Sequence, residues 1–424
     1  MSQAGRRTRS RVGISDALAV PEFRGIILAQ IASEAGDQIA RVALALLVLA
    51  DTGSALLAAA TFAVSFVPTF LGAALLGPVA DRFTRRTLML IADLGRAVAV
   101  GLLALVALPD TPLWVLFGLL FVAELFSPLF DAARSASIPD VLGAPQLVTV
   151  GTGLSRSLHL VNQAVGLVLG GLIVQLFSPR AALLLNALSF LVSYALIAAY
   201  MKRRPSTLEA AQSIGVLLSD LREGWVFLMA DPSRRALVLL GWGMAISLVA
   251  PEAVALALVR DESEADVWGG VLMASVIVGA AIGSVLVGRR PPRAQLDLVL
   301  PLAIAVCLPL LVTGIEPPVW VLVVLWFASG VAQAFLVPVM SFTTLLTVNE
   351  QRGRVVGIAS AGFAALTALG YLVTGFLADW TSPAFAVTVM AVVGLLVVTL
   401  AFWFWPAQRL RADIRALEDA ELTP

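Results

Sequence analysis

Charged and reactive side chains are scarce in this chain of 424 residues. It contains one cysteine (Cys307), one histidine (His159) and one lysine (Lys202). A single cysteine excludes an intramolecular disulfide, and together with a single histidine it excludes a metal site built from Cys or His ligands. Charged residues make up 13% of the sequence, against about 25% in soluble domains. The chain therefore has too few polar residues to cover a soluble globule.

Long apolar runs dominate the sequence. Hydrophobic residues make up 59% of it, and the mean hydropathy is +0.95. Each run is long enough to cross roughly 30 Å of hydrocarbon as a helix, and the runs lack the alternation of a transmembrane barrel. We therefore expect an all-α polytopic membrane protein with twelve transmembrane helices. The predicted spans are 25–50, 55–77, 87–108, 113–136, 146–177, 181–201, 235–258, 267–288, 297–314, 318–340, 354–378 and 383–405.

Arginine is distributed unevenly over the predicted loops. Of the 28 lysines and arginines, 22 lie on one side of the predicted membrane and two, Arg180 and Arg260, lie on the other. Because loops rich in Lys and Arg stay in the cytoplasm, we expect a multi-pass protein of the cell membrane with both termini cytoplasmic. The predicted organisation is an N-terminal tail (1–22), a six-helix bundle (23–201), a cytoplasmic linker (202–234), a second six-helix bundle (235–405) and a cytoplasmic C-terminal tail (406–424).

The linker carries the pattern of an amphipathic helix. Ser206-Thr207-Leu208-Glu209 matches a capping box, and leucines and Trp225 then recur at helical spacing until Asp231-Pro232 ends the helix. We expect a surface helix on the bilayer rather than a regulatory domain.

The two predicted bundles share sparse positions at similar separations. Pro128 and Pro338 are 210 residues apart, and Gly171 and Gly375 are 204 residues apart. These offsets suggest a duplicated half, as in transporters built from internal repeats.

Three charged residues lie on one face of the first span. Glu34, Asp37 and Arg41 follow one another in steps of three and four, which is the spacing of neighbours on a helix face. An intramembrane charge is costly and is a functional hypothesis by default. Burial favours the protonated form of a carboxyl group, and an adjacent cation favours the ionised form. Asp37 is therefore expected to bind a proton when Arg41 moves away; the alternative is a permanent structural pair of Asp37 with Arg41.

Two further sets of polar residues have structural interpretations. Asp93 and Arg96 in the third span are spaced as an ion pair, and we expect that pair to be structural. His159 in the fifth span is interpreted as a hydrogen-bonded packing residue rather than a proton relay.

Residues 77–86 read Gly-Pro-Val-Ala-Asp-Arg-Phe-Thr-Arg-Arg and lie in the predicted cytoplasmic loop after the second span. This stretch resembles the signature loop of the major facilitator superfamily, Gly-x-Leu-Ala-Asp-Arg-x-Gly-Arg-Arg, and departs from it at Val79 and Thr84. The resemblance implies two pseudo-symmetric six-helix bundles and a cytoplasmic gate in which Asp81 contacts helix ends of the opposite half. The matching positions are Gly77, Asp81, Arg82, Arg85 and Arg86.

The family fold also implies that spans 1, 4, 7 and 10 line a central cavity. Glu124 in span 4 and Glu252 in span 7 would then face the same cavity as Asp37, although Glu252 is also near enough to the span's end to reach the outer interface.

Shorter stretches are similar to the twelve-span branch of drug and siderophore exporters, which includes macrolide efflux and enterobactin export proteins. They are residues 36–40, 130–134, 186–190 and 352–354. The fifth span matches that branch's antiporter glycine motif at Gly153, Gly166, Gly170 and Gly171. Ordinary close helix packing is the alternative explanation of these glycines.

The leading hypothesis is a secondary active transporter that exports amphipathic small molecules or drugs by proton-coupled antiport and alternating access. A proton symporter or a uniporter for a nutrient is the alternative within transport. An intramembrane enzyme lacks any motif in its support, as does a nucleotide-driven pump, since the one lysine is not in a phosphate-binding loop; a non-transporting sensor is the remaining class. We expect a monomer whose partners are a small-molecule substrate, protons and the lipid bilayer, with no cofactor, metal or nucleic acid.

Overall fold

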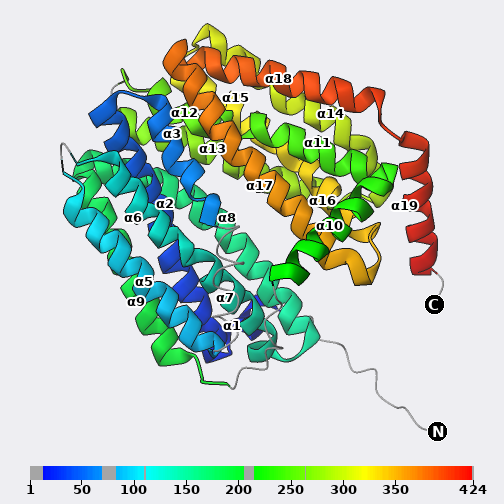
Figure 1. The fold of residues 1–424 in the computed structure, drawn as a ribbon, viewed down its shortest axis with the longest axis horizontal. Coiled ribbons are helices and arrows are strands. Elements are labelled where there is room, and N and C mark those ends of the chain that lie inside the picture. Colours follow the sequence, from blue (N-terminus) through cyan, green and yellow to red (C-terminus); the bar gives the residue numbers. More distant parts are fainter. Residues whose placement is uncertain (1–12, 69–82, 109–110, 205–213, 263, 423–424) are drawn as a thin grey trace.

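The computed structural model describes residues 13–68, 83–108, 111–204, 214–262 and 264–422. Every regular element in these ranges is a helix, and the helices form two groups that correspond to the two halves of the sequence (Figure 1).

The first group comes from the N-terminal half. It contains α1 (Ile14–Leu18), α2 (Pro21–Thr52), α3 (Ala55–Val64), α5 (Arg85–Val106), α6 (Leu113–Leu125), α7 (Ser127–Leu142), α8 (Pro145–Leu176) and α9 (Pro179–Tyr200). The second group comes from the C-terminal half. It contains α11 (Pro232–Leu248), α12 (Ala250–Leu258), α13 (Ala265–Gly288), α14 (Pro292–Leu311), α15 (Val319–Ala332), α16 (Leu336–Leu345), α17 (Asn349–Trp380) and α18 (Pro383–Trp403). Helices α10 (Ile214–Ala230) and α19 (Ala407–Leu422) flank the second group.

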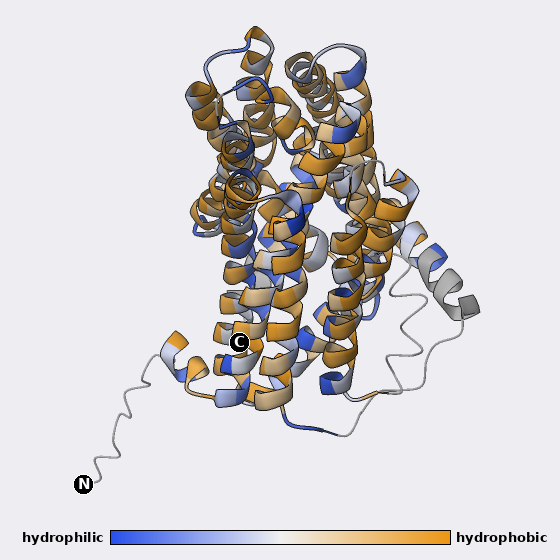
Figure 2. Cartoon of the chain, turned by 90° about the vertical axis from the view of Figure 1, so that its left-hand side faces the viewer, coloured by the Kyte–Doolittle hydropathy of each residue, from blue (hydrophilic) through white to orange (hydrophobic). Residues whose placement is uncertain are grey.

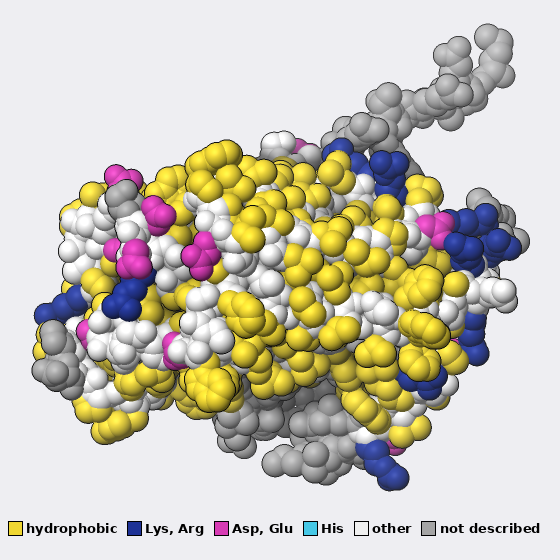
Figure 3. Space-filling view, turned by 90° about the horizontal axis from the view of Figure 1, so that it is seen from above, with side chains coloured by type: hydrophobic (Ala, Val, Ile, Leu, Met, Phe, Trp, Pro, Cys, Tyr) yellow, Lys and Arg dark blue, Asp and Glu magenta, His cyan; other side chains and the backbone are white. Residues whose placement is uncertain are grey.

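Ten helical segments in the described ranges are long and apolar enough to cross a membrane. Each broken helix is counted as one segment here, and α2 and α3 are not among the ten. Helix α2 has 32 residues but carries Glu34, Asp37 and Arg41, and α3 is a shorter apolar helix that is described as far as Val64. With these two, the segments correspond to the twelve predicted spans. Hydrophobic residues dominate the helices (Figure 2). On the face seen in Figure 3 the side chains are mainly hydrophobic, and charged side chains gather toward the two ends.

Three of the spans are broken near their middle. Helix α6 passes into α7 at Phe126, α11 passes into α12 at Val249, and a 3-10 turn (Gln333–Phe335) separates α15 from α16. A proline follows each break, because its ring and its missing N–H interrupt the helical hydrogen bonds. These prolines are Pro128, Pro251 and Pro338. The breaks fall in spans 4, 7 and 10, so two of them place Glu124 and Glu252 at irregular points of the backbone.

The two groups meet mainly along two helix pairs, α8 with α13 and α3 with α17, and α12 also contacts α3 and α2. A Cβ atom at Gly171 of α8 would overlap the backbone oxygen of Asp266 at the start of α13, and one at Gly270 would overlap the backbone oxygen of Leu167. A Cβ atom at Gly375 of α17 would lie 2.7 Å from the Cα atom of Leu56. Gly171 and Gly375, the pair matched at an offset of 204 residues, thus have equivalent places on the two sides of the interface. All these contacts lie at the end of the molecule opposite the chain termini (Figure 1).

The linker helix α10 packs on the second bundle. Leu228 is buried together with Val355 and Ile358 of α17, and the ring of Trp225 stacks on Trp242 of α11 at 5.6 Å. The helix ends at Ala230, as the Asp231-Pro232 signal predicts, since the Asp231 side chain accepts a hydrogen bond from the backbone N–H of Arg234 and caps α11. The predicted capping box at 206–209 lies outside the described residues.

The predicted C-terminal tail contains a helix that packs on the second bundle. Residues of the predicted tail 406–424 form helix α19, in which Leu410 and Ile414 are buried one turn apart. The hydroxyl of Ser233 donates to Asp413, and Arg409 pairs with Asp231 at 2.8 Å. The tail is a helix because these apolar positions recur at helical spacing and find a surface to cover.

Candidate functional site: a charged cluster in the N-terminal bundle

Helix α2 carries the first three candidates as one continuous helix through the middle of the N-terminal bundle. The side chains of Glu34, Asp37 and Arg41 keep 15%, 26% and 28% of their surface exposed. The predicted common face is therefore present, and each member of it has a different partner.

Arg41 forms its ion pair with Glu124, not with Asp37. The Arg41 Nη2 atom lies 3.1 Å from Glu124 Oε1, and the hydroxyls of Ser65 and Ser127 donate to the same carboxylate at 2.7 and 3.2 Å. The permanent pair of Asp37 with Arg41, which is the alternative to proton coupling, is not present in this structure. Glu124 ends α6 next to the break at Phe126, and this position brings its carboxylate within reach of Arg41.

Asp37 is approached by an arginine of another helix. Arg96 Nη1 of α5 lies 3.7 Å from Asp37 Oδ2, and Arg96 Nη2 lies 2.6 Å from Asp93 Oδ1. The Ser193 hydroxyl donates to the other oxygen of Asp93 at 2.6 Å. The ion pair predicted from the spacing of Asp93 and Arg96 thus forms, and Arg96 also reaches Asp37 of α2.

Arg96 is held between two aromatic rings. Its guanidinium carbon lies 4.6 Å from the ring centre of Phe130 and 4.4 Å from that of Phe190. Cation–π contact of this kind stabilises a desolvated cation. Phe130 and Phe190 begin and end two of the stretches that resemble the exporter branch, so those stretches contain residues that support the charge network.

Glu34 is the best satisfied of the carboxylates. It accepts hydrogen bonds from Arg134 at 2.6 Å, from Gln30 at 3.1 Å and from Asn162 at 3.2 Å, and His159 Nδ1 lies 3.3 Å from it. Sequence reasoning missed Arg134 and His159 as partners of Glu34.

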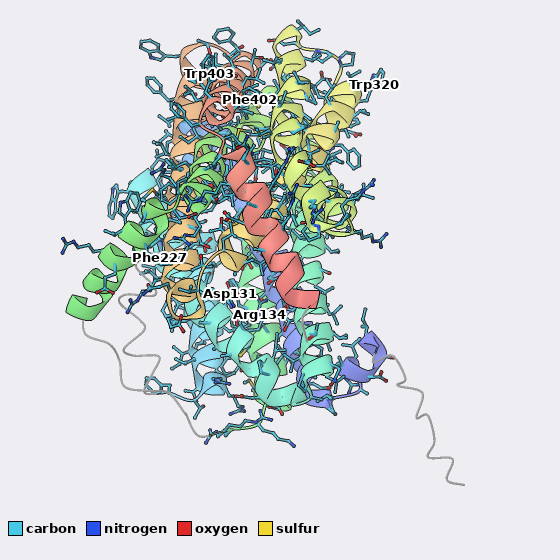
Figure 4. All side chains as sticks on the ribbon, turned by 90° about the vertical axis from the view of Figure 1, so that its right-hand side faces the viewer. Asp131, Arg134, Phe227, Trp320, Phe402 and Trp403 are labelled. Carbon is cyan, nitrogen blue, oxygen red and sulfur yellow. The ribbon has the colours of Figure 1, made fainter. Side chains whose placement is uncertain are left out.

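Arg134 also pairs with Asp131 at 3.0 Å, and both belong to α7 (Figure 4). A signal for its role existed, because Arg134 ends the 130–134 stretch that resembles the exporters. His159 is half-exposed, which differs from the expected packing residue.

A small cavity lies inside this cluster. It has a volume of about 20 Å³, and Asp37, Arg41, Arg96, Glu124 and Asn186 line it together with apolar residues. This volume suffices for about one water molecule. Asp37 and Glu124 thus share one polar space with two guanidinium groups.

Glu252 joins the cluster from the second bundle. It lies in the first turn of α12, where the helix dipole favours a negative charge, and Tyr371 of α17 lies beside it. The Tyr371 ring stacks on Phe62 of α3 at 5.5 Å, and Arg41 attracts the Glu252 carboxylate across the bundle interface. The structure thus places Glu252 at the interface of the bundles rather than at the outer edge.

Only part of the predicted gate loop lies in the described residues. Gly77, Asp81 and Arg82 lie outside them. Arg85 donates to the backbone oxygen of Ala136 at 2.5 Å and pairs with Asp140. Arg86 donates to the backbone oxygen of Ala198 at 2.7 Å, so both arginines connect the start of α5 to neighbours within its own bundle.

The glycine motif divides between packing and open space. Cβ atoms at Gly166 and Gly170 would crowd Gln38 and Val42 of α2, Gly171 faces α13, and Gly153 has no neighbour within 4 Å. Three of the four glycines therefore serve close helix packing. Whether the motif also reports antiport stays a prediction.

Comparison with known proteins identifies the family. The model of the Major Facilitator Superfamily matches residues 26–316 and 298–423, which together cover nearly the whole chain. The chain belongs to the major facilitator superfamily. It is therefore a multi-pass membrane transporter of small molecules and not an enzyme.

Among its relatives are two drug exporters. The multidrug efflux pump Tap of Mycolicibacterium fortuitum is 26% identical over 366 residues, which cover 84% of this chain and 88% of the relative. Macrolide efflux protein A of Streptococcus pyogenes is 25% identical over 222 residues, which cover 52% of this chain and 54% of the relative. The predicted resemblance to macrolide efflux proteins is confirmed.

Two solved structures share the fold. The nucleoside transporter NupG aligns with a TM-score of 0.71 at 11% identity, covering 91% of this chain and 99% of NupG. A bacterial homologue of the iron transporter ferroportin in its inward-facing state aligns with a TM-score of 0.68 at 16% identity, covering 90% of this chain and 98% of that protein. At such identities the likeness shows the arrangement of helices alone.

Proposed function

We propose that this transporter exports amphipathic small molecules in exchange for protons that enter the cell. The relatives Tap and macrolide efflux protein A support export as the direction. The excess of Lys and Arg in the loops at the end that holds the termini supports a cytoplasmic location of that end. The end at which the bundles touch is then the outer end, and the structure is inward-facing.

The charge balance of the N-terminal bundle carries the proposal. Its mostly buried members are four carboxylates against three guanidinium groups, whereas Asp131 and His159, which contact Arg134 and Glu34, are more than half exposed to solvent. The carboxylates are Glu34, Asp37, Asp93 and Glu124, and the guanidinium groups are Arg41, Arg96 and Arg134. A net charge inside a membrane protein is costly, so binding of one proton makes the network neutral.

Asp37 is the carboxylate that best fits the role of proton carrier. Both of its arginine neighbours are engaged more closely elsewhere, Arg41 with Glu124 at 3.1 Å and Arg96 with Asp93 at 2.6 Å, while Arg96 lies 3.7 Å from Asp37 itself. When Asp37 is neutralised, its electrostatic attraction for Arg41 and Arg96 is lost. Because Arg41 also attracts Glu252 of the second bundle, a proton on Asp37 changes the electrostatic attraction between the bundles and shifts the population of inward- and outward-facing states.

The direct test is transport by purified protein in proteoliposomes with an imposed pH gradient and a panel of amphipathic compounds. The variant Asp37→Asn mimics the protonated carboxyl group, and we expect gradient-driven transport to be lost while the protein remains folded. Asp51→Asn is the matched control, since Asp51 is an exposed aspartate at the end of the same helix. If Asp37→Asn kept the wild-type pH dependence, Asp37 would not be the coupling residue.

A cell assay tests the direction of transport. Dissipating the proton gradient should raise the accumulation of the substrate in cells that express the protein. A fall in accumulation would contradict export and favour the symporter.

A further inference from the structure

A groove on the second bundle has no role in the proposed transport cycle. It lies between α11 and α18 and has a volume of about 450 Å³. The two helices approach closely at Gly243, where a Cβ atom would lie 2.6 Å from Val397 Cγ1. The groove extends from this contact toward the start of α11 and the end of α18.

The walls of the groove are apolar except at its mouth. Leu239 and Leu400 line it and remain 47% and 61% exposed, and Trp405 lies at its end. From Gly243 to Arg235 the helix rises by about 12 Å, which is close to half of the roughly 30 Å hydrocarbon core of a bilayer. The groove thus has the depth of one leaflet.

Aromatic side chains mark the level of the membrane surface beside the mouth. Phe402, Trp403 and Phe404 at the end of α18 are 70%, 79% and 81% exposed, and Phe402 and Trp403 lie on the outer side of the bundle (Figure 4). Exposed aromatic residues are enriched where membrane helices leave the hydrocarbon core. The mouth of the groove therefore lies at the level of the lipid headgroups, in the leaflet on the side of the chain termini.

Arg235 is the charged residue at this mouth. It is exposed, and its Nη1 atom donates to the backbone oxygen of Met229 at 3.2 Å. A guanidinium group has five N–H donors in a planar fork that matches phosphate oxygens. Two further arginines nearby, Arg234 and Arg409, are balanced by the aspartates Asp231 and Asp413, so Arg235 supplies the net positive charge at the mouth.

We propose that the groove binds one anionic phospholipid, with an acyl chain between α11 and α18 and the phosphate on Arg235. The apolar walls fit the chain, the depth fits one leaflet, and the charge at the mouth fits the headgroup. Such a lipid fills the space where α11 and α18 separate. It stabilises the second bundle at the end from which the linker enters α11.

Native mass spectrometry of the full-length protein tests the site, with phosphatidylglycerol and phosphatidylcholine as probes. We expect wild-type protein to retain phosphatidylglycerol in preference to phosphatidylcholine. Arg235→Gln should lower the retained phosphatidylglycerol about fivefold, the effect of one basic residue near an anionic lipid. Arg203→Gln is the matched control, because it removes an exposed positive charge on the same side of the molecule but outside the groove.

A second variant tests the position of the acyl chain. Ala236 lines the groove, and Ala236→Phe should lower the retention of both lipids by filling it. Equal retention of the two lipids by wild-type protein, an unchanged signal in Arg235→Gln, or an equal loss in Arg203→Gln would each overturn the proposal. None of these outcomes depends on the transport direction or on Asp37.

Discussion

Asp379, in the last turn of α17, accepts a hydrogen bond of 2.6 Å from the backbone N–H of Ala55, the first residue of α3. The two residues belong to different bundles. The other oxygen of Asp379 accepts from the Ser54 hydroxyl at 2.5 Å and from the backbone N–H of Leu56 at 3.3 Å. A carboxylate of one bundle thus satisfies the free N–H groups at the start of a helix in the other, where the helix dipole also attracts it. Separation of the bundles at this end requires these bonds to break.

Asp379→Asn should therefore favour the state in which this end is open. The amide keeps one acceptor and loses the charge, a change worth about 1–2 kcal/mol, so the ratio of open to closed molecules should rise roughly 5- to 30-fold. Spin labels on cysteines introduced at positions 51 and 262, both exposed at this end, report the distance between the bundles. Asp261→Asn, an exposed aspartate at the same end, is the control. An unchanged distance distribution in Asp379→Asn would show that the contact does not govern opening.

Gly171→Val should prevent the closed arrangement at this end. Its side chain would overlap the backbone of Asp266, and backbone cannot move aside as a side-chain tip does. Overpacking of this kind costs about 1–3 kcal/mol, so the same spin labels should report a longer distance and transport should fall. Gly118→Val is the control, because Gly118 is a helical glycine with no neighbour within 4 Å. Wild-type transport by Gly171→Val would contradict the close packing of α8 on α13.

Arg96→Gln should destabilise the protein more than the removal of an exposed charge. The variant leaves Asp93, which is fully buried, without its cation. Breaking a buried ion pair from one side costs about 3–5 kcal/mol. Thermal unfolding in detergent measures the effect, and the double variant Asp93→Asn with Arg96→Gln should recover part of the loss because no uncompensated charge remains. If the loss of stability in the double variant equalled the sum of the losses in Asp93→Asn and Arg96→Gln, the two residues would not be coupled.

The positions of the helical segments and the common helix face of the charged residues in the first span could be predicted from the sequence, because both depend on local sequence pattern. An apolar run long enough to cross the hydrocarbon core predicts a span. Steps of three and four residues predict that Glu34, Asp37 and Arg41 share a helix face. The choice of partners could not be predicted in this way. Arg41 pairs with Glu124, 83 residues away, and only the relative height and rotation of α2 and α6 determine that contact.

The other contacts that were not predicted involve partners on three separate helices. Arg96, Arg134 and His159 come from α5, α7 and α8 and converge on the two acids of α2. Each has a local explanation in the sequence, as half of an ion pair, as part of a family stretch and as a packing residue. A local explanation does not exclude a second partner, because one guanidinium group has donors for several acceptors.

The glycines at the bundle interface have a consequence for the rate at which the protein exchanges between its inward- and outward-facing states. At Gly171 and Gly270 the two halves touch through main chain, with no side chain of either glycine between them. Surfaces that interlock through long side chains must change rotamers before they can move past each other, whereas two smooth backbones can rock with few such barriers. Exchange between the two states then needs few rotamer changes at these two glycines, and the discrete contacts to be broken are the polar bonds around Asp379 and the stacking of Tyr371 on Phe62.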